Sequence, residues 1–223
     1  MKRRVVKTAD GSTTIHIEEW GEHYHSTHGA IQEAYHVFID MGLNCFLNKQ
    51  KVISILEIGF GTGLNAFITY LECLKRQHDI TYVGVEGYPV SADEIAALNY
   101  VEALEATEYS TVFDTMHVKP WEQEIVLSEN FKLTKRNQFF ADITDKETFD
   151  LIYFDAFGAR VQPDLWTEAI FLKMFEALKS GGVLVTYAAK GSVRRAMLAV
   201  GFTVERLPGP PGKREMLRAT KPE

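Results

Sequence analysis

The chain has 223 residues, of which 46% are hydrophobic and 24% charged, so its composition is that of a globular protein long enough to bury a large core. No apolar stretch reaches the length of a membrane span, and the N-terminus turns polar too early for a signal peptide, so we expect a cytoplasmic protein without a membrane partner. The two cysteines lack metal-ligand spacing, so we expect no metal. The formal net charge of -6 disfavours nucleic acid, but both ends of the chain are basic: residues 1–8 carry four Lys/Arg and no acid, and residues 190–223 carry eight Lys/Arg against three Glu.

The first 50 residues are predicted to form a hairpin followed by a helix. Alternating apolar and polar residues flank Asp10-Gly11, which is a strong hairpin signal. Residues 27–47 then place apolar side chains at helical spacing. We therefore divide the chain into an N-terminal appendage, residues 1–50, and a main domain, residues 51–223.

From Val52 onward, short apolar runs alternate with helical segments, which predicts an α/β fold with a mostly parallel sheet. Strands are expected at 52–58, 80–86, 131–140, 149–156 and 182–189, and helices at 63–77, 91–104, 163–180 and 192–200. The helix at 163–180 is expected to stop at Gly181-Gly182. Residues 202–220 predict an antiparallel hairpin at the sheet edge, and residues 107–129 are interpreted as an insertion.

A glycine-rich loop follows the first of these strands, in the stretch ILEIGFGTGLNAF. Gly59, Gly61 and Gly63 alternate, whereas a dinucleotide loop needs its third glycine at position 64, which is Leu64. A triphosphate loop would need a GK[ST] sequence, which does not follow. Alternating glycines let the backbone approach a flat ligand closely, and Glu57 ahead of them can accept a hydrogen bond from an ammonium group. S-adenosylmethionine carries such an ammonium.

Two further acids extend this hypothesis. Glu86 ends the next strand, near the roughly 20-residue spacing at which an acid meets ribose hydroxyls. Together with Glu57 it favours S-adenosylmethionine over other nucleotides. The alternative is that both are surface acids at the ends of strands, with no role in binding. Asp142 follows the next strand and can reach an adenine amine, with a turn or cap residue as the alternative.

Asp155 and Phe157 stand at the carboxyl end of the strand at 149–156, where open α/β sheets bind ligands. A carboxylate can orient an amine and remove its proton, and an aromatic ring can stack on a planar substrate. The pair therefore suits methyl transfer to nitrogen. The alternative is that Asp155 caps a turn and Phe157 belongs to the core.

The chain resembles the methyltransferase part of the MnmC family. The resemblance covers nearly the whole chain and rests on HGAIQEAYHVF, EIGFGTGLN, DAFGARVQPDLW, GSVRRAMLAVGF and GKREML. It implies a Rossmann-like class I methyltransferase fold, S-adenosylmethionine as donor, and the amine of 5-aminomethyl-2-thiouridine at the wobble position of tRNA as acceptor. Where the family commonly has a proline after the aspartate and phenylalanine, this chain has Gly158-Ala159, which loosens that turn.

On this basis we assign candidate roles to residues. Asp155 and Phe157 are the candidate catalytic residues. The candidate donor-binding residues are Glu57, Gly59, Phe60, Gly61, Gly63, Asn65, Glu86, Asp142 and Asp155. The candidate contacts to the tRNA anticodon loop are Arg160, Lys190, Arg194, Arg195, Lys213 and Arg214. Arg194 and Arg195 also fit the exposed side of a helix, and Lys213-Arg214 also fits pairing with nearby acids.

Bifunctional members of the family carry a flavin-dependent domain after the methyltransferase part. This chain ends at Glu223, so we expect no FAD and a single-function protein, with a monomer as the working expectation. Three alternatives stay open: a methyltransferase for a small amine, a non-catalytic module that binds an adenosine ligand or RNA, and a dinucleotide oxidoreductase, which Leu64 disfavours.

Overall fold

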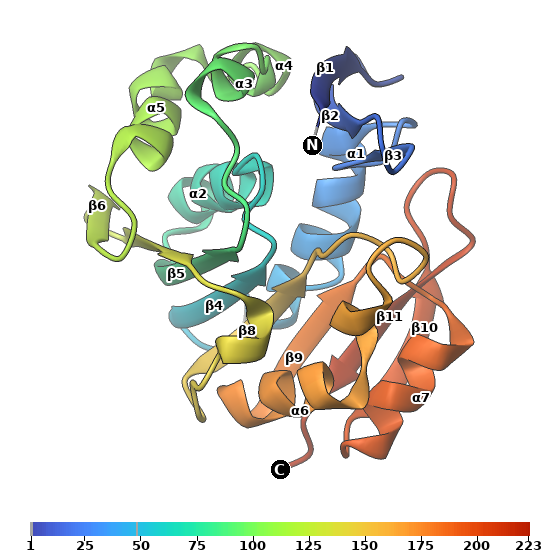
Figure 1. Cartoon of the computed structure of the whole chain (residues 1–223). Coiled ribbons are helices and arrows are strands. Elements are labelled where there is room, and N and C mark those ends of the chain that lie inside the picture. Colours follow the sequence, from blue (N-terminus) through green and yellow to red (C-terminus); the bar gives the residue numbers. More distant parts are fainter. Residues whose placement is uncertain (1, 48) are drawn as a thin grey trace.

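The computed structural model describes residues 2–47 and 49–223. Within them an 8-stranded sheet has the order β10-β11-β9-β8-β4-β5-β7-β6 (Figure 1). Its strands are β4 (Val52–Ile58), β5 (Asp79–Glu86), β6 (Glu124–Ser128), β7 (Phe131–Asn137), β8 (Phe149–Phe154), β9 (Leu178–Thr186), β10 (Thr203–Pro208) and β11 (Glu215–Thr220). The five strands from β9 to β7 pair in parallel, whereas β6, β10 and β11 pair antiparallel at the two edges. The predicted parallel sheet and its C-terminal edge hairpin are confirmed.

This strand order creates the place where a ligand can bind. From β4 the chain proceeds to β5 and β7 on one side, and it later returns to β8 and β9 on the other side. The order therefore reverses between β4 and β8. In open α/β sheets the crevice beyond the carboxyl ends of such strands is the usual ligand site.

Helices cover both faces of the sheet. They are α1 (Ala30–Ala34), α2 (Leu64–Arg76), α3 (Ala92–Ala96), α4 (Tyr100–Ala103), α5 (Ser110–Val118), α6 (Glu168–Ala177) and α7 (Gly191–Ala199). One hydrophobic cluster joins Phe67 and Phe113 to the sheet from the side of α2 and α5, and a second joins Phe171 and Met197 from the side of α6 and α7 (Figure 1). No helix among the described residues has the length and apolarity to cross a membrane.

The N-terminal hairpin is confirmed, and it docks on the helical layer. β1 (Arg3–Lys7) pairs antiparallel with β2 (Thr13–Ile17), which also pairs with β3 (Glu22–His23). The backbone N–H of Asn99 donates to Thr13 Oγ1, and its side chain donates to the Gly11 carbonyl, both at 3.0 Å. Asn99 lies between α3 and α4, so the helix expected at 91–104 is interrupted where the hairpin binds.

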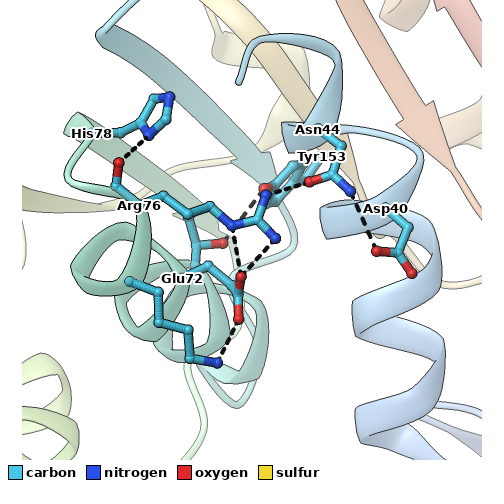
Figure 2. Close-up of polar contacts among 8 residues, drawn as sticks. Asp40, Asn44, Glu72, Arg76, His78 and Tyr153 are labelled. Atoms are coloured by element: carbon cyan, nitrogen blue, oxygen red, sulfur yellow. Dashed lines mark hydrogen bonds and ion pairs between the residues drawn. The ribbon is translucent and has the colours of Figure 1, made fainter. Parts of the chain in front are cut away.

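The helix expected at 27–47 is shorter and less regular than predicted. It begins at α1, continues as a π-helix at Tyr35–Asp40 and ends with a 3-10 turn at Leu43–Cys45. Figure 2 shows how α2 holds this segment: the Arg76 guanidinium donates to Asn44 Oδ1 at 2.5 Å and to Glu72 Oε2 at 2.8 Å. Phe38 packs in the same cluster as Phe67 of α2. The proposed domain boundary at residue 50 stays a prediction.

The prediction that a helix runs through 163–180 and stops at Gly181-Gly182 is wrong. A 3-10 turn occupies Pro163–Trp166, α6 ends at Ala177, and β9 already begins at Leu178. Leu178 pairs with Phe149, and the pairing register of β8 and β9 then shifts before Val183. Gly181, with φ 73°, lies in this irregular part of the strand, so the glycines accommodate a bulge rather than end a helix.

Candidate active site

A cavity of about 580 Å³ opens beyond the carboxyl ends of β4, β5 and β8. This volume is in the range of small-molecule sites. The glycine loop, Glu86 and the segment from Asp155 to Gly158 line it together. The N-terminal segment and Lys213 of the C-terminal hairpin complete its wall.

The loop after β4 begins with a glycine because its backbone packs closely against the segment after β8. Gly59 has φ 91°, and a Cβ on it would lie 2.8 Å from the Asp155 carbonyl oxygen. The N–H groups of Gly59 and Phe60 both donate to the Val85 carbonyl at 3.0 Å, which fixes the loop on β5. Gly63 precedes α2 with φ 73° and, unlike Gly59 and Gly61, does not line the cavity.

Glu86 links the glycine loop to the segment after β5. Its Oε2 accepts from the Gly61 N–H at 3.0 Å, and its Oε1 accepts from the Tyr88 N–H at 2.9 Å. The carboxylate also lines the cavity. A carboxylate oxygen accepts more than one hydrogen bond, so Glu86 can still receive the ribose hydroxyls of a nucleoside.

Asn65, the second residue of α2, connects two buried acids. Its Nδ2 donates to Glu57 Oε1 and to Asp155 Oδ2, each at 2.9 Å. Asn65 and Asp155 line the cavity, whereas Glu57 is 0% exposed and lies beneath that wall. Direct binding of a ligand by Glu57 stays a prediction, with Asn65 standing between Glu57 and the cavity.

Burial changes the proton affinity of both carboxyl groups. Desolvation raises the pKa of Glu57 well above its ordinary range, although the hydrogen bond from Asn65 opposes this. Desolvation, helped by the nearby charge of Glu33, raises the pKa of Asp155 to about 7, against the hydrogen bond from Asn65 and the charge of Lys213. Asp155 therefore exchanges a proton near neutral pH, as a general base must.

Aromatic rings form the wall beside Asp155. The Phe157 ring lies edge-on to Trp20 at 5.4 Å and to Tyr24 at 4.9 Å between ring centres. All three line the cavity. The sequence analysis did not identify Trp20 and Tyr24 as site residues. The feature that could have indicated them is the concentration of aromatic and acidic residues in EEWGEHYH at 18–25.

Asp142 lies outside the cavity lining. It is exposed and ends the 3-10 turn Phe140–Asp142, while Phe139, Phe140 and Ala141 line the cavity. Phe139 is 55% exposed and faces Tyr88, which is 56% exposed, at 5.8 Å between ring centres. This pair offers exposed aromatic surface next to Glu86. The role assigned to Asp142 stays a prediction.

The side chains of the candidate tRNA contacts differ in their ion pairing and in their exposure to solvent. Arg160 forms an ion pair with Glu22, and Lys213 forms one with Glu33. Arg194 is partly buried on α7, with a buried Nε that has no partner among the described residues. The other three, Lys190, Arg195 and Arg214, have exposed side chains, and Arg214 lies 3.9 Å from the Glu215 carboxylate in an exposed ion pair.

The residues present fit S-adenosylmethionine. The glycine loop lines the cavity, and Glu86 presents a carboxylate beside it, hydrogen-bonded to the Gly61 N–H. Asn65 Oδ1 is buried without a hydrogen-bond partner among the described residues, so one acceptor next to the cavity is left over for a donor such as an ammonium group.

Comparisons with known proteins agree with this geometry. Residues 117–222 match the family described as S-adenosyl-L-methionine-dependent methyltransferases. The tRNA 5-methylaminomethyl-2-thiouridine biosynthesis bifunctional protein MnmC of Aromatoleum aromaticum is 31% identical, over 96% of this chain and 35% of its own length. The chain is similar to the part of MnmC that this alignment covers. The MnmC of Leptospira borgpetersenii is also 31% identical, over 87% of this chain and 31% of its own length.

A solved structure extends the similarity to the whole chain. The crystal structure of MnmC2 from Aquifex aeolicus matches with a TM-score of 0.78 and 25% identity, covering 100% of this chain and 72% of that one. The expected fold, that of class I S-adenosylmethionine-dependent methyltransferases, is thereby confirmed. The chain spans about a third of the length of the curated MnmC relatives, at 35% and 31%.

Proposed function

We propose that this protein transfers a methyl group from S-adenosylmethionine to the amine of 5-aminomethyl-2-thiouridine at the wobble position of tRNA, giving 5-methylaminomethyl-2-thiouridine. Homology to MnmC supports the reaction, and one observation in the structure carries the proposal. Asp155 shares a cavity with the glycine loop and Glu86, and its pKa is about 7. The cavity thus combines a surface suited to the donor with a carboxylate suited to an amine.

Bound S-adenosylmethionine supplies the methyl group, and the chain's own residues prepare the acceptor. An alkylamine is mostly protonated at neutral pH and then has no lone pair with which to attack. Asp155 takes up that proton, because a base with a pKa near the operating pH is the most effective. Asn65 holds Asp155 Oδ2, and we assign Oδ1 to the amine.

The aromatic wall orients the nucleobase of the tRNA substrate in this proposal. Phe157, Trp20 and Tyr24 line the cavity beside Asp155. Proteins commonly read an unstacked RNA base by stacking it on such rings. Ring stacking would place the planar thiouracil so that its aminomethyl substituent points to Asp155.

The partner in this proposal is the anticodon loop of tRNA, and the expected location is the cytoplasm, because the substrate is tRNA. The exposed charges of Lys190 and Arg195 are the best candidates for phosphate contacts. Arg214 follows, because its side chain is 93% exposed although it pairs with Glu215 at 3.9 Å. Arg160 and Lys213, whose charges are paired with Glu22 and Glu33, are weaker candidates.

Transfer of a labelled methyl group to tRNA tests the proposal. Purified protein is given labelled S-adenosylmethionine together with tRNA that carries 5-aminomethyl-2-thiouridine or with unmodified tRNA. Label is expected in the first tRNA alone, and nucleoside analysis should find it in 5-methylaminomethyl-2-thiouridine. Labelling of small amines without labelling of tRNA would overturn the tRNA substrate, and failure to bind the donor in calorimetry would overturn the reaction.

A further inference from the structure

An ion pair spans the wall of the cavity near Asp155. Glu33 of α1 pairs with Lys213, which lies in the turn between β10 and β11. Their side chains are 9% and 32% exposed, and both line the cavity together with Asp155. In Figure 1 this turn rises from the C-terminal hairpin toward the N-terminal segment. The pair therefore joins two parts of the chain that are 180 residues apart.

Each partner is held by a second contact. Glu33 Oε2 accepts from the Ser26 N–H at 2.7 Å. The Lys213 ammonium lies 3.8 Å from the centre of the Tyr187 ring, close enough for a cation–π interaction. The Tyr187 hydroxyl donates to the carbonyl of Ala156 at 2.8 Å, which is the residue after Asp155. The ion pair is thus fixed relative to the loop that carries Asp155.

The turn that carries Lys213 is also packed against the N-terminal segment. His36 Nε2 lies 2.8 Å from the Pro208 carbonyl oxygen. A Cβ on Gly212 would lie 2.1 Å from Cδ2 of His28, so the two segments are in close contact. These contacts distinguish the pair from a mobile surface salt bridge, which would contribute little.

The acids beside the aromatic wall differ in their partners. Glu22 pairs with Arg160 and Glu33 pairs with Lys213. Asp155 has a hydrogen bond from Asn65 but no ion pair with a Lys or Arg among the described residues. Glu22 and Glu33 have cationic partners, whereas Asp155 has none in the described part of the chain, so an incoming ammonium can pair with Asp155 without breaking an existing ion pair.

The two charges of the pair act on Asp155 in opposite directions. Desolvation is the main cause of its raised pKa, Glu33 raises it further, and Lys213 lowers it. The other ionisable groups that interact with Asp155 are Glu57 of β4 and the phenols of Tyr82, Tyr100 and Tyr187. Glu57 and these phenols have raised pKa values through burial. Glu33 and Lys213 are the two groups whose charges act on the pKa of Asp155.

We propose that Glu33 and Lys213 are positioning residues for methyl transfer: their ion pair fixes the wall around the acceptor amine, and its two charges set when Asp155 can accept a proton. This proposal rests on the proposed function, since it assigns Asp155 the role of base. Removing Lys213 alone leaves Glu33 as a second acid beside Asp155. Removing Glu33 alone leaves an uncompensated ammonium that repels a cationic amine.

Titration of Asp155 by NMR tests the proposal without requiring turnover. Protein labelled with ¹³C at the aspartate carboxyl carbons is titrated, and the signal of Asp155 is assigned by its loss in Asp155→Asn. The variants are Glu33→Gln, Lys213→Gln and the double variant. Lys132→Gln, which breaks an exposed pair with Glu124 at 3.2 Å, is the matched control.

The single variants are expected to move the titration midpoint in opposite directions. Glu33→Gln should lower it, Lys213→Gln should raise it, and the double variant should lie between them, while Lys132→Gln should leave it unchanged. The pH profile of methyl transfer should move in the same directions, and Lys213→Arg should retain the wild-type midpoint. If Lys213→Gln does not fold, the titration midpoint of Asp155 in Glu33→Gln tests the proposal: a midpoint below that of the wild type supports it, and an unchanged one contradicts it.

Midpoints that stay unchanged, or that move the same way in both single variants, would overturn the proposal. Failure of the proposed function looks different. The wild-type protein would then transfer no methyl group to aminomethylated tRNA, while the NMR midpoints would still report whether Glu33 and Lys213 control Asp155.

Discussion

Replacing Asp155 with asparagine is expected to make the folded protein more stable and the enzyme much less active. Asparagine keeps the shape and can still accept the hydrogen bond from Asn65 at the position of Oδ2. It has no charge to bury and cannot take up a proton. The substitution therefore separates the requirements of folding from those of catalysis.

The size of the stability gain follows from the raised pKa of Asp155. In the unfolded chain the carboxyl group ionises near 3.8, whereas in the folded protein it keeps its proton up to about 7. Between these values the folded state binds more protons, so the free energy of unfolding of the wild type falls as pH rises, and it levels off above about pH 7. The difference of about 3 units corresponds to about 4 kcal/mol at most. Because Asp155 borders an open cavity, water screens part of this, and we expect about 2 kcal/mol.

Chemical denaturation of wild type and Asp155→Asn at several pH values measures this difference. The two proteins should be almost equally stable near pH 4, and the advantage of the variant should grow up to about pH 7 and then stay constant. Methyl transfer at pH 8 should fall by roughly 100-fold or more, as for loss of a general base. A difference in stability that does not depend on pH, or turnover that is retained, would refute the assignment of Asp155 as a buried base.

Three further substitutions probe the rest of the site. Gly59→Ala should lower the free energy of unfolding by about 2 kcal/mol in denaturant titrations, because φ is 91° and the Cβ would lie 2.8 Å from the Asp155 carbonyl oxygen; an unchanged stability would contradict this packing. Glu86→Gln should weaken donor binding in calorimetry about tenfold, since an amide cannot accept from both backbone N–H groups; wild-type affinity would remove Glu86 from the donor site. Lys135, 1% exposed, has its pKa lowered by burial to about 8, so from pH 8 to 10 the wild type should gain stability relative to Lys135→Met, by at most about 3 kcal/mol; parallel pH curves would contradict this.

The parts of the site that local sequence determines are those at the ends of neighbouring parallel strands. The alternation of apolar runs and helical segments predicts which residues end each strand, and parallel strands bring their carboxyl ends to one edge. Gly59 after β4, Glu86 at the end of β5 and Asp155 after β8 therefore line one cavity. The predicted strand ends and the glycine spacing together pointed to this edge of the sheet as the candidate site.

Sequence patterns were less reliable where tertiary contacts override local preference. Gly181-Gly182 has the usual signature of a helix end, but Leu178 is already drawn into the sheet by its pairing with Phe149. The helix expected at 91–104 contains no glycine or proline, and it breaks where Asn99 bonds to the N-terminal hairpin. Phe149 is distant in sequence from Leu178, and the hairpin is distant from Asn99, so a local sequence pattern cannot predict either helix end.

The sequence by itself determined the fold class, the glycine loop and the acids at the strand ends, because periodicity and strand-end position are local properties of the chain. The tertiary structure alone decided which distant groups complete the wall. It brought Trp20, Tyr24 and Glu33 to the cavity, and it placed Lys213 in an ion pair with Glu33, where the sequence had left both a phosphate contact and pairing with an acid open. The physical reason is that ion pairs and ring contacts depend on how separate segments pack, and sequence spacing does not encode distances between them.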